Sequence, residues 1–226
     1  MSLKEDGNMK LRGEQSSAHA FENRKKFYKE NNILHENVIG ACVEHTNNVS
    51  VVNKDSERLV PNTDGLVTTE KNIYLAVTSA DCFPVLLYDK KNGVIGIAHA
   101  GWRGIIKEIV PHTINKMVRN GAKEKDIFVT VGPGISQDHF DFEFREMISK
   151  FGLYNQDRYV IAGSTLDKVK IDLRKIIADQ LVKFGIRRNN IHDCGMCTFA
   201  RENEFFSARR EGRDFSVMMS VIGMKA

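Results

Sequence analysis

The chain has 226 residues, of which 42% are hydrophobic and 27% are charged, and its formal net charge at pH 7 is +4. This hydrophobic content excludes an intrinsically disordered chain, because it is enough to bury a core. The lysines and arginines are spread along the sequence and form no basic stripe, so we expect no nucleic-acid partner, although the positive charge suits a phosphate-bearing small substrate.

The first half of the chain predicts one helix followed by a series of strands. The helix is expected over 16–30, with Ser16 or Ser17 as its N-cap. Apolar runs bounded by turn residues then predict six strands, at 37–43, 48–52, 65–69, 73–79, 83–89 and 93–99. After Gly104 the apolar residues recur at helical spacing, and Pro111 is expected to kink or split this helix.

The second half continues with short strands and two more helices. We expect strands within 126–135, 159–161, 168–172, 204–210 and 215–222, and helices at 140–151 and 173–186. Gly185 is a suitable C-cap for the last helix. Strands outnumber helices and several follow one another as hairpins. The sequence therefore predicts an α+β fold, with mixed sheet and outer helices in a single domain over residues 1–226.

Neither a membrane span nor a secretion signal is expected. No apolar run reaches transmembrane length, and the polar N-terminus lacks the apolar core of a signal peptide. We therefore expect a cytoplasmic protein with no membrane partner. In that compartment the four cysteines are expected to be thiols or metal ligands rather than disulfides, at Cys42, Cys82, Cys194 and Cys197.

The stretch "ADCFPVLLYDKKNGVIGIAHAGWRG" places a cysteine and a histidine at the open end of a predicted hairpin. If 83–89 and 93–99 pair around the "DKKNG" turn, Cys82 and His99 lie opposite each other to within about one residue of register, with Cβ atoms roughly 5 Å apart. This distance suits a catalytic Cys–His pair or two ligands of one metal. Pro84 has no amide proton, so we expect an edge strand or a bulge after Cys82.

The ordinary alternative is that both residues are structural, because free cysteines are among the most buried residues. Two neighbours favour a site. Asp81 is unusual inside an apolar strand, and Arg103 follows His99 in a small-residue turn that leads into a helix. A helix N-terminus and an arginine both suit an anion. His45 would complete a zinc-like set of one cysteine and two histidines, but the residues alone favour it no more than the other histidines.

These residues belong to a longer series of motifs through which the whole chain resembles a known family. The motifs are "GNMKLR…FENRKKF", "EHTNNV", "TDGLVT", "TSADCFPVLLYD", "GIAHAGWRG", "VGPGIS" and "CTFARENEFFSARREG". In this order they resemble the laccase-domain purine nucleoside phosphorylases, the YfiH-like proteins that are also called polyphenol oxidases or peptidoglycan editing factors. The resemblance implies a layered α/β fold.

The resemblance also implies a function. By position, the catalytic residues and metal ligands fall on His45, Cys82 and His99, with zinc as the expected metal and copper as one that the same donors can bind in vitro. The implied reactions are phosphorolysis of adenosine, inosine and methylthioadenosine, and deamination of adenosine. The implied partners are therefore purine nucleosides and phosphate, and the oligomeric state is left open.

Several residues are candidates for the remaining parts of this chemistry. Arg103 is the first candidate for holding phosphate, with Arg209 and Arg210 as further ones. A carboxylate must move the proton in deamination, and Asp81 and Glu44 are the sequence neighbours of two ligands. Because consecutive strand residues point to opposite faces, a carboxylate next to a ligand within a strand would point away from it.

Three other functions stay open at this point. The first is a cysteine hydrolase or amidase acting on cell-wall precursors, with Cys82 as nucleophile and His99 as base. The second is a copper-dependent polyphenol oxidase, which is disfavoured because the chain has seven histidines and no two are separated by one residue. The third is a binding module without catalysis, against which the "SADC" and "HAGWRG" blocks argue.

Overall fold

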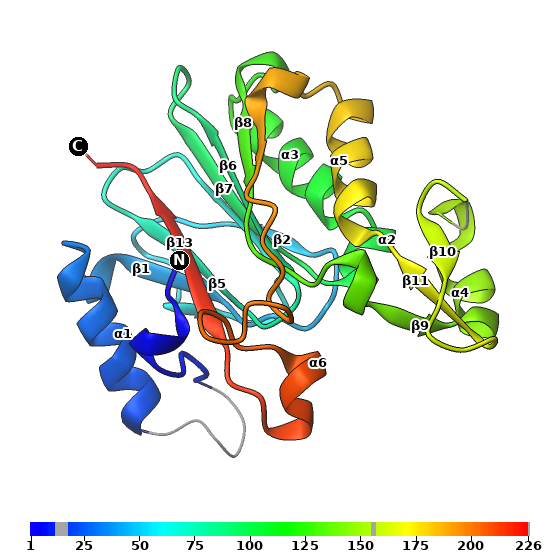
Figure 1. The fold of residues 1–226 in the computed structure, drawn as a ribbon. Coiled ribbons are helices and arrows are strands. Elements are labelled where there is room, and N and C mark those ends of the chain that lie inside the picture. Colours follow the sequence, from blue (N-terminus) through cyan, green and yellow to red (C-terminus); the bar gives the residue numbers. More distant parts are fainter. Residues whose placement is uncertain (12–17, 155–156, 226) are drawn as a thin grey trace.

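A computed structural model describes residues 1–11, 18–154 and 157–225 of the chain (Figure 1). In this part of the chain there are six α-helices, and no helix combines the length and apolar character needed to cross a bilayer. The helices are α1 (Ala18–Glu30), α2 (Trp102–Ile106), α3 (Ile109–Arg119), α4 (Phe144–Phe151), α5 (Leu173–Lys183) and α6 (Ala208–Glu211). They lie outside three β-sheets.

The largest sheet is mixed, with the strand order β12-β8-β6-β7-β4-β2. Its strands are β2 (Val49–Val51), β4 (Gly65–Thr68), β6 (Phe83–Asp89), β7 (Val94–Ala100), β8 (Phe128–Val131) and β12 (Ile191–Asp193). Helices α3 and α5 cover one face, where Ile114 and Ile177 share a core with Val85 and Leu87 of β6 (Figure 1). This apolar face drives the packing of the two helices.

A second mixed sheet covers the opposite face, with the order β13-β5-β1-β3. Its strands are β1 (Val38–Ala41), β3 (Leu59–Val60), β5 (Tyr74–Ser79) and β13 (Met218–Gly223). Leu75 and Val77 of β5 pack against Ile95 and Ile97 of β7. Because β7 is covered on both faces, all of its residues are buried, which explains its continuous apolar sequence.

The third sheet is small and antiparallel, and it projects from the main body together with α4 (Figure 1). Its strands are β9 (Asp141–Glu143), β10 (Val160–Ala162) and β11 (Lys168–Ile171). Phe142 of β9 and Phe151 of α4 pack around Trp102. These aromatic contacts join the projection to the beginning of α2.

The predicted fold class is confirmed, since layered mixed sheets are flanked by helices. The split of the helix after Gly104 is also confirmed, but Pro111 does not make it. The break is at Glu108, which has a left-handed φ of 62°, and Pro111 lies in the first turn of α3, where a missing amide proton costs no helical hydrogen bond. Gly185, with φ 104°, lies just beyond the end of α5, as predicted.

Two of the predicted elements are formed differently in the structure. The strand expected at 204–210 is wrong: the segment leads into α6, where the Ser207 side chain accepts from the Arg210 amide and so caps the helix. The helix expected at 140–151 begins only at Phe144, because 141–143 pair with β11 as β9. The N-cap predicted at Ser16 or Ser17 lies outside the described residues.

Candidate metal centre

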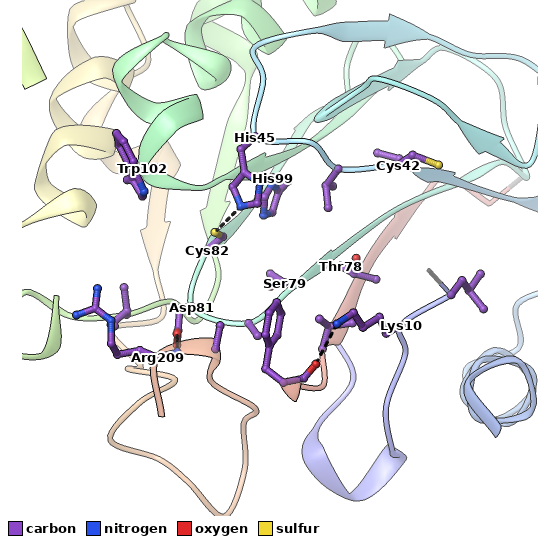
Figure 2. A pocket seen from close by; sticks show the side chains of 18 of the residues that line it. Lys10, Cys42, His45, Thr78, Ser79, Asp81, Cys82, His99, Trp102 and Arg209 are labelled. Carbon is purple, nitrogen blue, oxygen red and sulfur yellow. Dashed lines mark hydrogen bonds between the residues drawn. The ribbon is translucent and has the colours of Figure 1, made fainter. Parts of the chain in front are cut away.

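Three side chains from different segments meet beside the end of the largest sheet (Figure 2). His45 follows β1, Cys82 directly precedes β6 and His99 lies in β7. Their ligand atoms all lie within 4.8 Å of one another; Cys82 Sγ is 3.8 Å from His45 Nε2, and the two imidazole centroids are 5.0 Å apart. One thiol and two imidazoles in this arrangement are a donor set suited to zinc or copper.

The hairpin that carries Cys82 and His99 differs in two respects from its prediction. In the β6–β7 ladder Pro84 opposes His99 and Phe83 opposes Ala100, so Cys82 falls level with Gly101, two residues from the predicted register. The expected edge strand or bulge after Cys82 is also wrong, because β6 lies between β7 and β8 and pairs with β7 in unbroken register from Phe83 to Asp89. Pro84 is tolerated because it lies just beyond the last β6–β8 pair, where its carbonyl still accepts from the Gly132 amide at 2.9 Å and the ladder needs no amide proton from it.

Gly101 makes room for two of the three donors. A Cβ atom at this position would lie 2.8 Å from Cys82 Sγ and 2.8 Å from His45 Cδ2. These distances are well inside van der Waals contact, so any side chain here would displace a donor. A glycine is thus required by the close approach of the site, and its φ of −78° shows no strain.

We therefore predict that Gly101→Ala weakens zinc binding by roughly tenfold or more, because the added methyl group would displace Cys82 or His45 from its position as a ligand. The measurement is competition with a chromophoric chelator. Gly40→Ala is the matched control, because a Cβ there would meet the mobile end of Leu59 at 3.1 Å and lies outside the donor cluster. Equal zinc affinity in the Gly101 variant and the wild type would contradict this account of the site.

The buried carboxylate of Asp64 organises both histidines, and the sequence prediction did not assign it a role. It accepts hydrogen bonds from the backbone amides of Glu44, His45 and Thr46 and from the Thr46 hydroxyl. It also accepts from His99 Nδ1 at 2.8 Å. A carboxylate that accepts from Nδ1 leaves the lone pair of Nε2 available to a metal, so Asp64 fixes the donor atom of His99 and the loop of His45.

The electrostatics of the site favour an anionic thiol. Burial acts to raise the pKa of Cys82, but the imidazoles of His99 and His45 outweigh it and lower this pKa to about 6. Burial acts to lower the pKa of His99, yet the Cys82 thiolate and Asp64 raise it to about 9. Burial would also raise the pKa of Asp64, but hydrogen bonds from His99 and Thr46 hold it at about 2. Without a metal, a thiolate therefore faces an imidazolium at neutral pH.

The three donors form part of the wall of a cavity of about 520 Å³ (Figure 2). This volume is in the range of small-molecule sites. Much of the wall is apolar and aromatic, with Trp102, Phe140 and Phe215 among its members. Cys42 also lines it, and all four cysteines of the chain are free thiols.

The two predicted proton carriers are poorly placed for that role. Asp81 lines the cavity, but its carboxylate accepts from the Thr198 hydroxyl at 2.7 Å and from the Arg209 amide at 2.7 Å. Asp81 therefore links the segment that contains Thr198 and Arg209 to the loop before β6 by hydrogen bonds. Glu44 is exposed and is not part of the cavity wall.

The three predicted phosphate ligands are placed differently from one another. Arg103 is exposed, with its guanidinium 4.4 Å from the centre of the Trp102 ring, and lies outside the cavity wall. Arg210 also lies outside it and donates to three backbone carbonyls. Neither of these two side chains therefore lines the cavity that holds the donor cluster. Arg209 does line the cavity, and its guanidinium donates to the carbonyls of His139 and Asp141.

Comparison with known proteins shows the family to which the chain belongs. Residues 3–225 match the family model described as multi-copper polyphenol oxidoreductase laccase. The chain belongs to this family. The solved structure of the YfiH protein of Bacillus licheniformis superimposes with a TM-score of 0.90 at 28% identity, over 96% of this chain and 85% of that one. The family resemblance predicted from the motifs is thereby confirmed.

Two curated relatives carry names that describe an activity. A purine nucleoside phosphorylase of Bacteroides thetaiotaomicron is 35% identical over 73% of this chain and 62% of that protein. The adenosine deaminase RL5, from an unknown prokaryotic organism, is 34% identical over 70% of this chain and 61% of that protein. The chain thus spans less than two thirds of the length of these relatives.

Proposed function

We propose that this protein is a zinc-dependent purine nucleoside enzyme, which cleaves adenosine, inosine or methylthioadenosine with phosphate and also deaminates adenosine. The observation that carries the proposal is the cluster of His45, Cys82 and His99 on the wall of a cavity of about 520 Å³. The names of the relatives, purine nucleoside phosphorylase and adenosine deaminase, support the same substrate class.

The residues fit a zinc ion. Three protein donors with a free coordination position are typical of catalytic zinc, and Asp64 supplies the outer hydrogen bond that orients one imidazole. When bound, such a metal supplies a Lewis acid that polarises a substrate atom or activates a water molecule. The same donors suit copper, so the metal content of the purified protein distinguishes the two.

In phosphorolysis, the side chains of the cavity wall bind the nucleoside and shield it from water. Trp102 and Phe140 offer apolar surface to a purine and exclude water. In the reaction the bond from ribose C1′ to purine N9 breaks, and a phosphate oxygen bonds to C1′. The electron pair leaves with the purine, and the proton of the hydrogen phosphate ion ends on a purine nitrogen, so that atoms and charges balance.

Deamination uses water in place of phosphate. Water replaces the 6-amino group of adenosine, which gives inosine and ammonia. Asp64 accepts from His99 Nδ1, so with a metal bound the proton of this imidazole would stay on Nδ1 and Nε2 would be the ligand atom. The two reactions therefore share the donors but differ in the second substrate, which allows them to be measured separately.

The test is a product analysis by chromatography with the metal-loaded protein. We expect adenine and ribose 1-phosphate from adenosine only when phosphate is present, and inosine whether or not it is present. Inosine and methylthioadenosine are assayed in parallel. A metal-loaded protein that converts none of the three nucleosides would refute the proposal.

The low pKa of Cys82 also favours a second candidate, a cysteine hydrolase or amidase acting on cell-wall precursors. In that function the Cys82 thiolate is the nucleophile and His99 the base. Turnover by metal-free protein would favour it, and loss of turnover on removal of the metal would exclude it.

The state of the thiol can be tested independently of any substrate. Because the pKa of Cys82 is lowered to about 6, metal-free protein has a reactive thiolate at lower pH than an ordinary cysteine, whose pKa is about 8.5. We predict that alkylation of Cys82 by iodoacetamide, followed by mass spectrometry, reaches half its maximal rate near pH 6. Zinc should suppress the reaction. A midpoint near pH 8.5 would contradict the described electrostatics.

A further inference from the structure

The cavity carries an excess of positive charge beyond the metal donors. Three cationic side chains line it, Lys10, Arg24 and Arg209, against Asp81 as the carboxylate among the described lining residues. Both oxygens of Asp81 already accept hydrogen bonds from the protein. The net positive charge of the cavity wall therefore favours the binding of an anion.

Arg24 is an unusual member of this wall because it is a buried cation. Its side chain is on α1, only 8% of the residue is exposed, and its Nε and Nη2 atoms donate to the backbone carbonyl of Met9 at 2.9 and 2.6 Å. No carboxylate among the described residues forms an ion pair with it. A buried charge whose partners, among the residues described, are neutral is costly to maintain, and a bound anion would offset this cost.

Lys10 follows Met9 directly, so Arg24 positions the segment that carries a second cation. Lys10 Nζ lies 3.4 Å from the carbonyl oxygen of Phe215 and 4.4 Å from the centre of its ring. These partners are neutral, and an ammonium group has three donors. In Figure 2, Lys10 and Arg209 lie on opposite sides of the cavity, with the metal donors above the space between them.

We propose that Lys10 and Arg24 form the subsite that binds the phosphate co-substrate. This inference rests on the proposed function and replaces the earlier candidates Arg103 and Arg210. An ammonium and a planar guanidinium are both established types of phosphate donor, and together their charges match a hydrogen phosphate dianion. The phosphate enters the reaction by bonding through one oxygen to C1′ as the bond to N9 breaks, and its proton passes to the purine.

The test compares Lys10→Gln with the wild type at limiting phosphate. Loss of one charged hydrogen bond predicts a rise in the KM for phosphate of about tenfold or more. Adenosine deamination is the internal reference, because it does not use phosphate, and the ratio of phosphorolysis to deamination should fall by a similar factor. Lys10→Arg should restore part of the phosphate affinity.

Lys4→Gln is the matched control. Lys4 also donates from Nζ to a backbone carbonyl, that of Glu202, and lies over a phenylalanine ring, that of Phe206, but it is not part of the cavity wall. The KM for phosphate should not change in this variant. Thermal melting of both variants shows whether either substitution disturbs the fold.

Calorimetry with inorganic phosphate and no nucleoside separates this inference from the proposed function. The wild type should bind phosphate, and Lys10→Gln should bind it about tenfold more weakly. This outcome would support the subsite even if the protein converted no nucleoside. An unchanged phosphate affinity and KM in Lys10→Gln would overturn it, and a loss in Arg209→Gln instead would assign the phosphate to the opposite wall.

Discussion

Cys82→Ser is expected to lose its bound metal and to lower kcat/KM for nucleoside phosphorolysis by at least about 100-fold, because the site loses the donor that is anionic at neutral pH. A serine hydroxyl keeps its proton at this pH and is a weak ligand for zinc. The remaining two imidazoles keep their positions, because Asp64 accepts hydrogen bonds from the His45 backbone amide and from His99 Nδ1. Metal analysis of the purified variant and steady-state kinetics with adenosine and phosphate measure the two effects.

Cys194→Ser is the matched control for this substitution. Cys194 is also a free, half-buried thiol, but it lies outside the donor cluster and the cavity wall. It should keep both metal and activity. If Cys82→Ser also retained both, the cluster would not be the catalytic site.

Asp64→Asn is expected to have the second-largest effect on the site, and it should lower both the metal affinity and the stability of the fold. Loss of an outer-shell carboxylate typically lowers metal affinity or activity by about 10–100-fold. The amide NH₂ of the asparagine also faces groups that donate to Asp64 in the wild type. We therefore expect the free energy of unfolding to fall by about 1–3 kcal/mol. A chelator competition and a urea titration measure the two changes.

Asp89→Asn distinguishes a positioning role from a purely structural one. Asp89 is also fully buried and accepts from the amide and side chain of Asn92 and from the amide of Lys123, but it lies at the far end of β6. This control should lose a similar amount of stability and keep its zinc affinity. If Asp64→Asn lost stability alone, Asp64 would have no part in the metal site.

The sequence predicted those parts of the site that depend on local pairing. Cys82 and His99 belong to one hairpin, so turn length and alternation brought them close, with a register error of two residues. His45 was different, because its loop reaches the site through hydrogen bonds to Asp64, 19 residues further along the chain. No local pattern predicts such a contact, and only the family resemblance identified this ligand.

Other features also depended on distant contacts. Lys10 was not predicted, because its place in the cavity depends on Phe215, 205 residues away. Arg103 and Arg210 were predicted from their type and neighbours, yet the first stacks on Trp102 and the second binds backbone carbonyls. Long apolar runs such as β6 and β7 were recognised correctly, whereas the two-residue strand β3 is too short to leave a pattern.

A zinc titration of metal-free protein, with adenosine phosphorolysis as the readout, shows whether the metal held by His45, Cys82 and His99 drives the reaction. We expect no turnover at the start, a linear rise as zinc is added, and saturation at about one zinc per chain. The same titration of Cys82→Ser should remain flat. Full turnover before zinc is added, or inhibition as zinc binds, would rule out a zinc-dependent reaction and favour Cys82 as a nucleophile.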